Sequence, residues 1–231
     1  MRTKLEDALK ILGKLLMVAA GLVLFMAPSA FADSVVTFNG SYAFGNAGYG
    51  IPPYGGTLDG QAAEFYCVDF SHDIVSGDSW PAIVTPLSNS SNYSSTYLYT
   101  GSNATTEMIY QEFAWLITQG MGSTNQNAIA ADQWAIWSLS GGAGDDPYTG
   151  PTDSASYLLA EAQTAVNNGF TGQGWEILTP DNAAGGYGQE FMVYTPEPAG
   201  LLLLGIGLCA LVFVKRQGWF GLRSPVEGSQ S

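Results

Sequence analysis

A strand is predicted most clearly at residues 62–70, which read AAEFYCVDF. Alternate side chains of a strand point to opposite faces, so Phe65 and Cys67 share one face. Tyr66 and Val68 then share the other face. Because both faces carry apolar side chains, we expect this strand to be covered on two sides by other parts of the fold.

The sequence around this strand predicts further strands and a loop. Residues 33–86 favour strands, because apolar and aromatic residues are separated there by glycine and asparagine. A loop rich in Gly, Pro and Tyr is expected at 48–56. Residues 87–106 are rich in Ser, Thr and Asn, which predicts a solvated loop.

Three helices are predicted after this loop, and residues that can cap a helix precede the second and the third. They are expected at 108–119, from 125 to about 139, and from about 153 to about 169, where apolar residues recur at helical spacing. Closing strands are predicted at 175–178 and 187–194. The order of strands, helices and strands indicates α+β, with a single domain of β-strands and a central group of about three helices.

The charges of the 231-residue chain are separated along the sequence. All seven basic residues lie near the two ends, whereas Asp33 to Thr195 contains 16 acidic residues and no Lys or Arg. A domain without cationic side chains cannot neutralise phosphates, so no nucleic-acid partner is expected. The chain also lacks a GxxxxGK[ST] sequence, which excludes a P-loop nucleotide site.

Residues 1–32 have the features of an export signal. Basic residues precede an uncharged apolar core at 15–26, and Ala30 and Ala32 then form a small-x-small cleavage site. We expect signal peptidase to cleave between Ala32 and Asp33, so that the following domain is exported.

A second apolar segment lies near the C-terminus, at residues 199–214. It carries no charge and is followed by Lys215 and Arg216. At about 1.5 Å per residue it spans about 24 Å, which suits a short transmembrane helix with some snorkelling. The basic pair predicts a cytoplasmic tail at 217–231 and a domain anchored at the inner membrane, facing the periplasm.

The motif Pro196-Glu197-Pro198 stands just before this apolar segment. The order of motif, apolar segment and basic pair over residues 195–216 resembles the PEP-CTERM sorting signal of Gram-negative bacteria. The resemblance implies processing by an exosortase-type enzyme, and a place on the cell surface or in an extracellular matrix with exopolysaccharide. The tail after residue 216 departs from the family, so a retained membrane span is the alternative.

Cys67 is the one cysteine in the exported region, and Cys209 lies in the apolar C-terminal segment. Cys67 therefore has no partner for an intramolecular disulfide. Three interpretations are open: an inert core thiol, an intermolecular disulfide, or a cysteine committed to another bond.

Three short motifs favour the third interpretation. They read FYCVD at 65–69, DQWAIW at 132–137 and GQEFM at 188–192. Together they resemble the thioester domain of bacterial surface adhesins, over roughly residues 60–195. That family has an aromatic-Cys-aliphatic strand, a Thr-Gln-x-Ala-Ile/Val-Trp helix and a late Gln.

The resemblance implies that Cys67 and Gln189 form a thioester within a domain at 33–194. Asp132, where Thr is usual, and Gly188, where an apolar residue is usual, depart from the family pattern. The residues implied to support the bond are Gln133, which is also the alternative acyl donor, Ala135, Trp137 and His72.

The implied chemistry is attack of a thiolate on a Gln carboxamide carbon, with loss of ammonia. The activated acyl group could then be captured once by an amine or hydroxyl of an unidentified surface or matrix partner. Neither a cofactor nor multiple turnover is required. A Lys amine in the domain would react with the acyl group, so the lack of Lys would protect it. Compositional drift in acidic secreted proteins is the alternative explanation for the lack of Lys.

Other functions are also consistent with the sequence. His72 lies between Asp69 and Asp73 and could activate Cys67 in a Cys/His hydrolase, provided that a turn at Ser71 brings the two together. A passive surface or matrix protein with a buried free cysteine is another possibility. Acidic residues offer ligands for Ca²⁺, but the spacing of a calcium-binding loop is absent, so no metal site is predicted.

Overall fold

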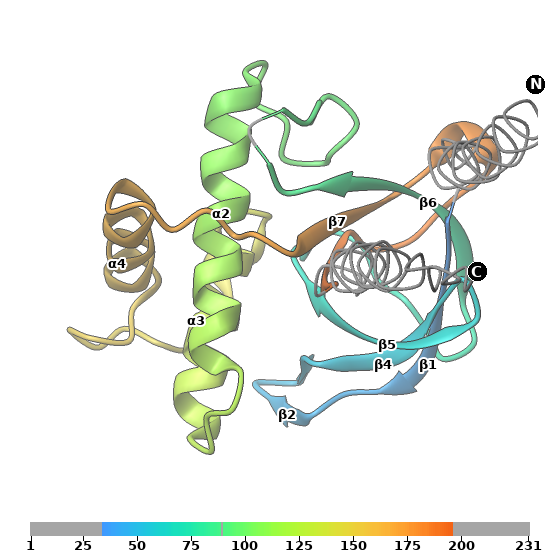
Figure 1. Cartoon of the computed structure of the whole chain (residues 1–231). Coiled ribbons are helices and arrows are strands. Elements are labelled where there is room, and N and C mark those ends of the chain that lie inside the picture. Colours follow the sequence, from blue (N-terminus) through green and yellow to red (C-terminus); the bar gives the residue numbers. More distant parts are fainter. Residues whose placement is uncertain (1–33, 89, 196–231) are drawn as a thin grey trace, which may run out of the picture. The chain divides into compact units, whose positions relative to one another are not determined.

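The computed structural model describes residues 34–88 and 90–195, which belong to one compact unit (Figure 1). No helix in these two ranges is long and apolar enough to cross a membrane. The predictions that lie outside them concern the export signal at 1–32, the cleavage site at Ala32 and Asp33, the motif Pro196, Glu197 and Pro198, the span at 199–214, the basic pair Lys215 and Arg216, and the tail at 217–231.

Six antiparallel strands form a closed barrel (Figure 1). In the order in which they pair, they are β1 (Ser34–Ser41), β4 (Tyr54–Leu58), β5 (Gln61–Cys67), β8 (Phe191–Tyr194), β7 (Trp175–Pro180) and β6 (Ser79–Pro86), which pairs with β1. A separate hairpin between β1 and β4 consists of β2 (Phe44–Asn46) and β3 (Tyr49–Ile51). Closure pairs both edges of every barrel strand.

Strand β5 has the two-sided burial that its sequence predicts. Phe65 and Cys67 lie in the barrel interior, whereas Tyr66 on the opposite face packs against the helices. The strand ends at Cys67, three residues before the predicted end. The main-chain N–H of Ser71 donates to the Asp69 carboxylate at 2.8 Å, and this Asx turn redirects the chain.

Three α-helices pack together beside the barrel, which confirms the mixed fold with a central helical group. They are α2 (Asn103–Gly120), α3 (Gln126–Ser138) and α4 (Ala155–Asn167). Helix α2 begins five residues earlier than predicted, because the Ser102 side chain caps it. Asn125 caps α3 as expected, but Ser154 precedes α4 in place of Thr152 or Asp153.

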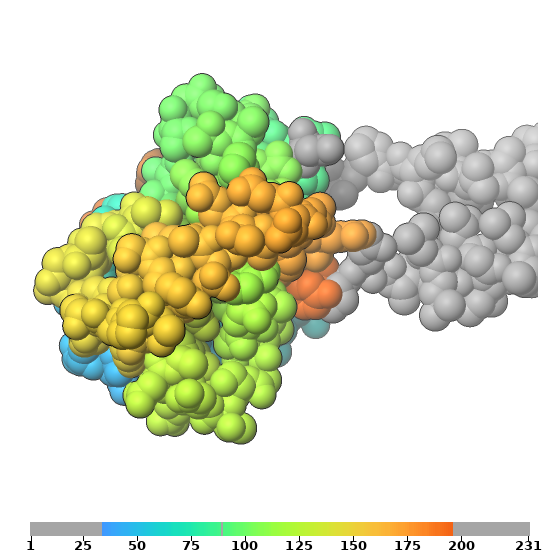
Figure 2. Space-filling model, turned by 90° about the vertical axis from the view of Figure 1, so that its left-hand side faces the viewer, coloured from blue at the N-terminus to red at the C-terminus, as the bar shows by residue number. Residues whose placement is uncertain are grey.

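Two hydrophobic clusters make up the core. One fills the barrel, and α3 contributes Trp134 and Trp137 to it. The other lies between the helices and the outer face of the barrel, where the strands contribute Tyr66, Ile177 and Met192. Helix α4 and its flanking segments cover this second cluster on the side facing the viewer in Figure 2. Helix α3 therefore joins the helical layer to the barrel interior.

The last strand is shorter than predicted, and this changes the position of Gln189. The predicted strand covers 187–194, but β8 begins at Phe191, so Gln189 precedes the strand by two residues. Cys67 pairs with Phe191 in the antiparallel register of β5 and β8. Continuing this register places Gln189 opposite Asp69, where β5 has already ended.

Candidate functional site

The Cys67 thiol is enclosed at the end of β5. The residue is 0% exposed, and its Sγ donates to the main-chain oxygen of Asp69 at 3.0 Å. Burial raises the pKa of the thiol to about 12, while the nearby indole N–H of Trp137 and the contact with Asp69 oppose part of this rise. At neutral pH the thiol is therefore protonated and shielded from solvent.

The Gln189 carboxamide reaches the same main-chain oxygen. Its Nε2 donates to the oxygen of Asp69 at 3.3 Å and also to the main-chain oxygen of His72. The Cys67 sulfur and this nitrogen are no more than about 6.3 Å apart, because their distances to the shared oxygen are 3.0 and 3.3 Å. The structure thus brings the two residues of the implied crosslink together.

Gln133 lies on the other side of Cys67. This buried residue of α3 donates from Nε2 to the main-chain oxygen of Cys67 at 2.7 Å, which ties the helix to the end of β5. Ala135 is fully buried in the cluster between helices and barrel. Asp132 is half-buried, and burial raises its pKa to about 7. Gln133 is thus held at the main chain of Cys67, which suits a supporting role.

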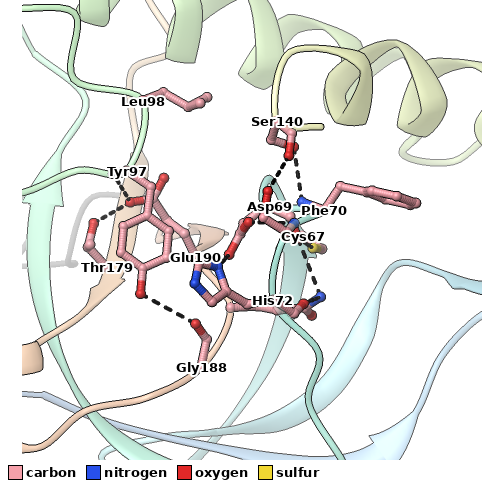
Figure 3. Close-up of polar contacts among 12 residues, drawn as sticks. Cys67, Asp69, Phe70, His72, Tyr97, Leu98, Ser140, Thr179, Gly188 and Glu190 are labelled. Carbon is pink, nitrogen blue, oxygen red and sulfur yellow. Dashed lines mark hydrogen bonds and ion pairs between the residues drawn. The ribbon is translucent and has the colours of Figure 1, made fainter. Parts of the chain in front are cut away.

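His72 pairs with Asp69 rather than with Cys67 (Figure 3). Its Nδ1 lies 2.6 Å from the carboxylate of Asp69, which is only 4% exposed. The half-exposed imidazole packs against Tyr97, with ring centroids 5.0 Å apart. The turn at Ser71 does form, but it directs the imidazole into contact with Asp69 and Tyr97.

Trp137 is held in a cluster of aromatic rings next to the thiol. Its ring centroid lies 5.2 Å from that of Trp134, 5.4 Å from that of Phe70 and 6.1 Å from that of Tyr49. The side chain is buried, yet its Nε1 has no hydrogen-bond partner among the described residues. The N–H lies near the Cys67 sulfur and lowers the pKa of the thiol as a donor to the sulfur would, but it has no oxygen or nitrogen acceptor among the described residues.

Glu190, next to Gln189, is a buried carboxyl whose importance the sequence did not reveal. It is 0% exposed and accepts hydrogen bonds from Thr179 Oγ1 at 2.6 Å, from the N–H of Tyr97 at 2.9 Å and from the Tyr110 hydroxyl (Figure 3). Burial raises its pKa to about 7, although these bonds partly oppose the rise. Glu190 thereby fixes the chain at Gln189 to β7, α2 and the preceding loop.

Two hollows are lined in part by the segment that follows β5. One, of about 250 Å³, is lined by Gln189, Trp137, Phe70 and Asp73, among others. The other, of about 500 Å³, is lined by Asp69, Ser71, His72 and Tyr97, among others. The side chains of Gln189 and His72 therefore border different hollows. Solvent or a partner could approach the carboxamide from the smaller one.

Comparison of the chain with models of protein families, with curated proteins and with solved structures finds no match. In the part of the chain that the structure describes, no group of three or more His, Cys, Asp or Glu side chains is arranged to hold a metal ion. The function is therefore argued from the geometry around Cys67 and Gln189.

Proposed function

We propose that this protein is an exported surface or matrix protein that attaches covalently to a partner through a thioester between Cys67 and Gln189. The observation that carries the proposal is the convergence of the thiol and the Gln189 carboxamide on the main-chain oxygen of Asp69. A folded framework that holds both groups at one acceptor supports the proposal, because attack on an unreactive amide requires the reacting groups to be held close together.

The proposed bond formation balances without another reactant. The Cys67 sulfur adds to the side-chain carbonyl carbon of Gln189, and the C–N bond of the carboxamide then breaks. The nitrogen leaves as ammonia and takes with it the proton that the thiol loses. Because the thiol and Nε2 donate to the same oxygen, the proton has a short path from sulfur to the leaving nitrogen.

In the capture step the sulfur, which was the nucleophile in bond formation, becomes the leaving group. An amine or hydroxyl of the partner attacks the acyl carbon, the C–S bond breaks, and the sulfur regains a proton as a thiol. The partner is then joined to residue 189 by an amide or an ester bond. Because the glutamine nitrogen has left as ammonia, each molecule reacts once.

Burial of the sulfur supports this proposal, because a thioester must be protected from water until its partner arrives. Cys67 lies within the apolar cluster of the barrel, close to the indole of Trp137. The lack of Lys between Asp33 and Thr195 has the same effect, since no lysine amine of the domain can consume the acyl group.

The geometry favours this chemistry over a Cys/His hydrolase. In a hydrolase the imidazole would activate the thiol, but here the sulfur donates to a main-chain oxygen and His72 pairs with Asp69. Burial raises the pKa of Cys67 and opposes formation of a thiolate in both mechanisms, so it does not separate them. A passive protein with a buried thiol would share this burial, and the experiment below separates it from the proposal.

The termini complete the proposed route of the protein. Signal peptidase would cleave before Asp33, and an exosortase-type enzyme would act near Pro196-Glu197-Pro198. The anchored or released domain would then meet a partner at the cell surface or in an exopolysaccharide matrix. Both steps rest on sequence motifs outside the described residues.

Intact mass of the purified protein tests the proposal. We expect a mass lower than that of the sequence by one ammonia molecule, and methylamine should add its own mass to this form. Cys67→Ser should restore the full mass and remove the reaction with methylamine. A full mass in the wild-type protein, with Cys67 freely alkylated after unfolding, would establish the passive alternative.

A further inference from the structure

The buried N–H of Trp137 lacks an acceptor, which is costly in a protein interior. Native structures rarely leave a buried donor without a partner, so its presence calls for a physical explanation. Trp137 is 3% exposed, and its Nε1 is one of three buried side-chain polar atoms without a partner among the described residues. The other two are Nε1 of Trp80 and Oδ1 of Asp153.

The surroundings of Trp137 fix the direction of this N–H. Rings of Trp134, Phe70 and Tyr49 pack around the indole, with centroids 5.2 to 6.1 Å from its own. At position 142 an added Cβ would lie 3.0 Å from the Cβ of Trp137 and from the ring of Phe70, so the backbone packs tightly against the base of the indole. These contacts leave the indole little room to rotate.

An acceptor without a donor lies at the same place. The Gln189 carboxamide uses its nitrogen for the oxygens of Asp69 and His72, but its Oε1 accepts no hydrogen bond within the described ranges. Gln189 and Trp137 both line the hollow of about 250 Å³. A residue with an unpaired buried donor and a residue with an unpaired carbonyl oxygen thus line one hollow.

We propose that the indole N–H of Trp137 donates a hydrogen bond to the acyl oxygen of Gln189 in the thioester and in the tetrahedral species that precede and follow it. This inference rests on the proposed thioester function and makes Trp137 a catalytic residue rather than only a packing residue. The thiol form then leaves the N–H unpaired because its acceptor is the oxygen of the bonded state.

The chemistry explains why a fixed donor is needed there. When the sulfur adds to the carbonyl carbon of Gln189, the electron pair of the C=O bond moves to the oxygen, which becomes negative. The pair returns when ammonia leaves, and the same movement occurs again when the partner attacks. A fixed donor in a dry site stabilises this oxygen far more than in water, and removal of one such donor costs about 100- to 1,000-fold in rate.

The first test compares Trp137→Phe with Trp80→Phe in the full chain. Both substitutions keep an aromatic ring and remove a buried N–H that has no partner. We expect Trp137→Phe to slow ammonia loss and aminolysis by methylamine about 100-fold or more. Trp80→Phe lies in the same cluster, does not line the hollow and keeps an aromatic ring against Gly188, so it should change both rates little. Equal, near wild-type rates in both variants would overturn the inference.

The second test uses the wild-type protein and does not depend on the folding of a variant. A hydrogen bond weakens the C=O bond, so the thioester carbonyl stretch should lie below that of a thioester without a donor. The stretch is identified by infrared difference spectra before and after methylamine, with ¹³C-labelled glutamine. Replacing Trp137 by benzothienylalanine, which exchanges N–H for sulfur, should raise the frequency. An unshifted stretch in the wild-type protein would contradict the inference.

The two proposals fail in different ways. Absence of ammonia loss in the wild-type protein would remove the thioester and the role of Trp137 together. A wild-type protein that forms the thioester, with Trp137→Phe loading and reacting at the wild-type rate, would leave the proposed function intact and reject only the donor.

Discussion

The thiol of Cys67 and the side-chain nitrogen of Gln189 donate to one acceptor, the main-chain oxygen of Asp69, at 3.0 and 3.3 Å. The two residues lie 122 positions apart in the sequence and meet because β5 pairs with β8. The shared acceptor holds a nucleophile and an electrophile close together at the point where β5 has ended, so the site depends on the geometry of that end.

Gln133 stabilises this end of β5 from the helical side, so Gln133→Leu should weaken it. The substitution leaves the buried main-chain oxygen of Cys67 without its donor at 2.7 Å. We expect the free energy of unfolding to fall by about 1–3 kcal/mol in urea titrations, and ammonia loss to slow. Ammonia loss should not be abolished, since Gln189 supplies the carboxamide. Complete loss of the mass deficit in a folded Gln133→Leu variant would instead identify Gln133 as the acyl donor.

Glu190 should make stability depend on pH. Because burial raises its pKa from 4.5 to about 7, the folded protein holds this proton more tightly than the unfolded chain. The free energy of unfolding should therefore be highest below about pH 4.5 and fall as pH rises through 7. Glu190→Gln imitates the protonated carboxyl and should remove up to about 3 kcal/mol of this fall, measured by urea unfolding at pH 5 and 8.

Two further variants control the Glu190 experiment. Glu161→Gln, on an exposed position of α4, should leave the pH profile unchanged. Asp132→Asn should remove a separate part of the slope, because burial raises the pKa of Asp132 in the same direction. Parallel profiles for the wild-type protein and Glu190→Gln would show that Glu190 is ionised in the folded state at all pH values tested.

Packing against Trp80 explains why position 188 is a glycine, which the sequence did not show. A Cβ at this position would lie 2.8 Å from the indole of Trp80, which is buried in the barrel. Trp80 thus occupies the space of the apolar side chain expected before the late Gln. We expect Gly188→Ala to lower the free energy of unfolding by about 1–3 kcal/mol and to slow ammonia loss by displacing Gln189. Gly45→Ala, where a Cβ meets only one atom at 3.8 Å, is the matched control and should do neither.

His72 contributes its main-chain oxygen to Gln189, so its side chain should be dispensable for bond formation. We expect His72→Phe to keep the ring contact with Tyr97 and to slow ammonia loss by less than about tenfold. Intact mass over time measures this. Hydrolytic turnover of an ester or amide substrate that disappears in His72→Phe would favour the Cys/His hydrolase instead.

Local patterns in the sequence predicted part of the local structure. The loop predicted at 48–56 was wrong, because β3 and the start of β4 lie there. The alternation of Phe65, Tyr66 and Cys67 predicted a strand buried on both faces, and apolar residues at helical spacing predicted three helices. Closure of the barrel was not predictable in this way, because the pairing of β1 with both β4 and β6 joins segments with no common local pattern. The early end of β5 depends on an Asx turn at Asp69, which the apolar Phe70 concealed.

For the candidate site, too, the sequence predicted some features and not others. The motifs identified Cys67, Gln133 and Gln189, and the structure brings all three to the end of β5. The shared acceptor could not be predicted, because a main-chain oxygen has no signature in the sequence. Glu190 could have been identified from one feature of the sequence, since it stands directly before the apolar run FMV. An acidic residue in that position predicts a buried carboxyl with hydrogen-bond partners.

Locating the methylamine label tests the central claim most directly. The wild-type protein is treated with methylamine and digested, and tandem mass spectrometry then finds the modified residue. The account predicts a single γ-glutamyl methylamide at Gln189, a free thiol at Cys67 after the reaction, and no label in Cys67→Ser. A label at any other residue, or none in the folded wild-type protein, would contradict a thioester between Cys67 and Gln189.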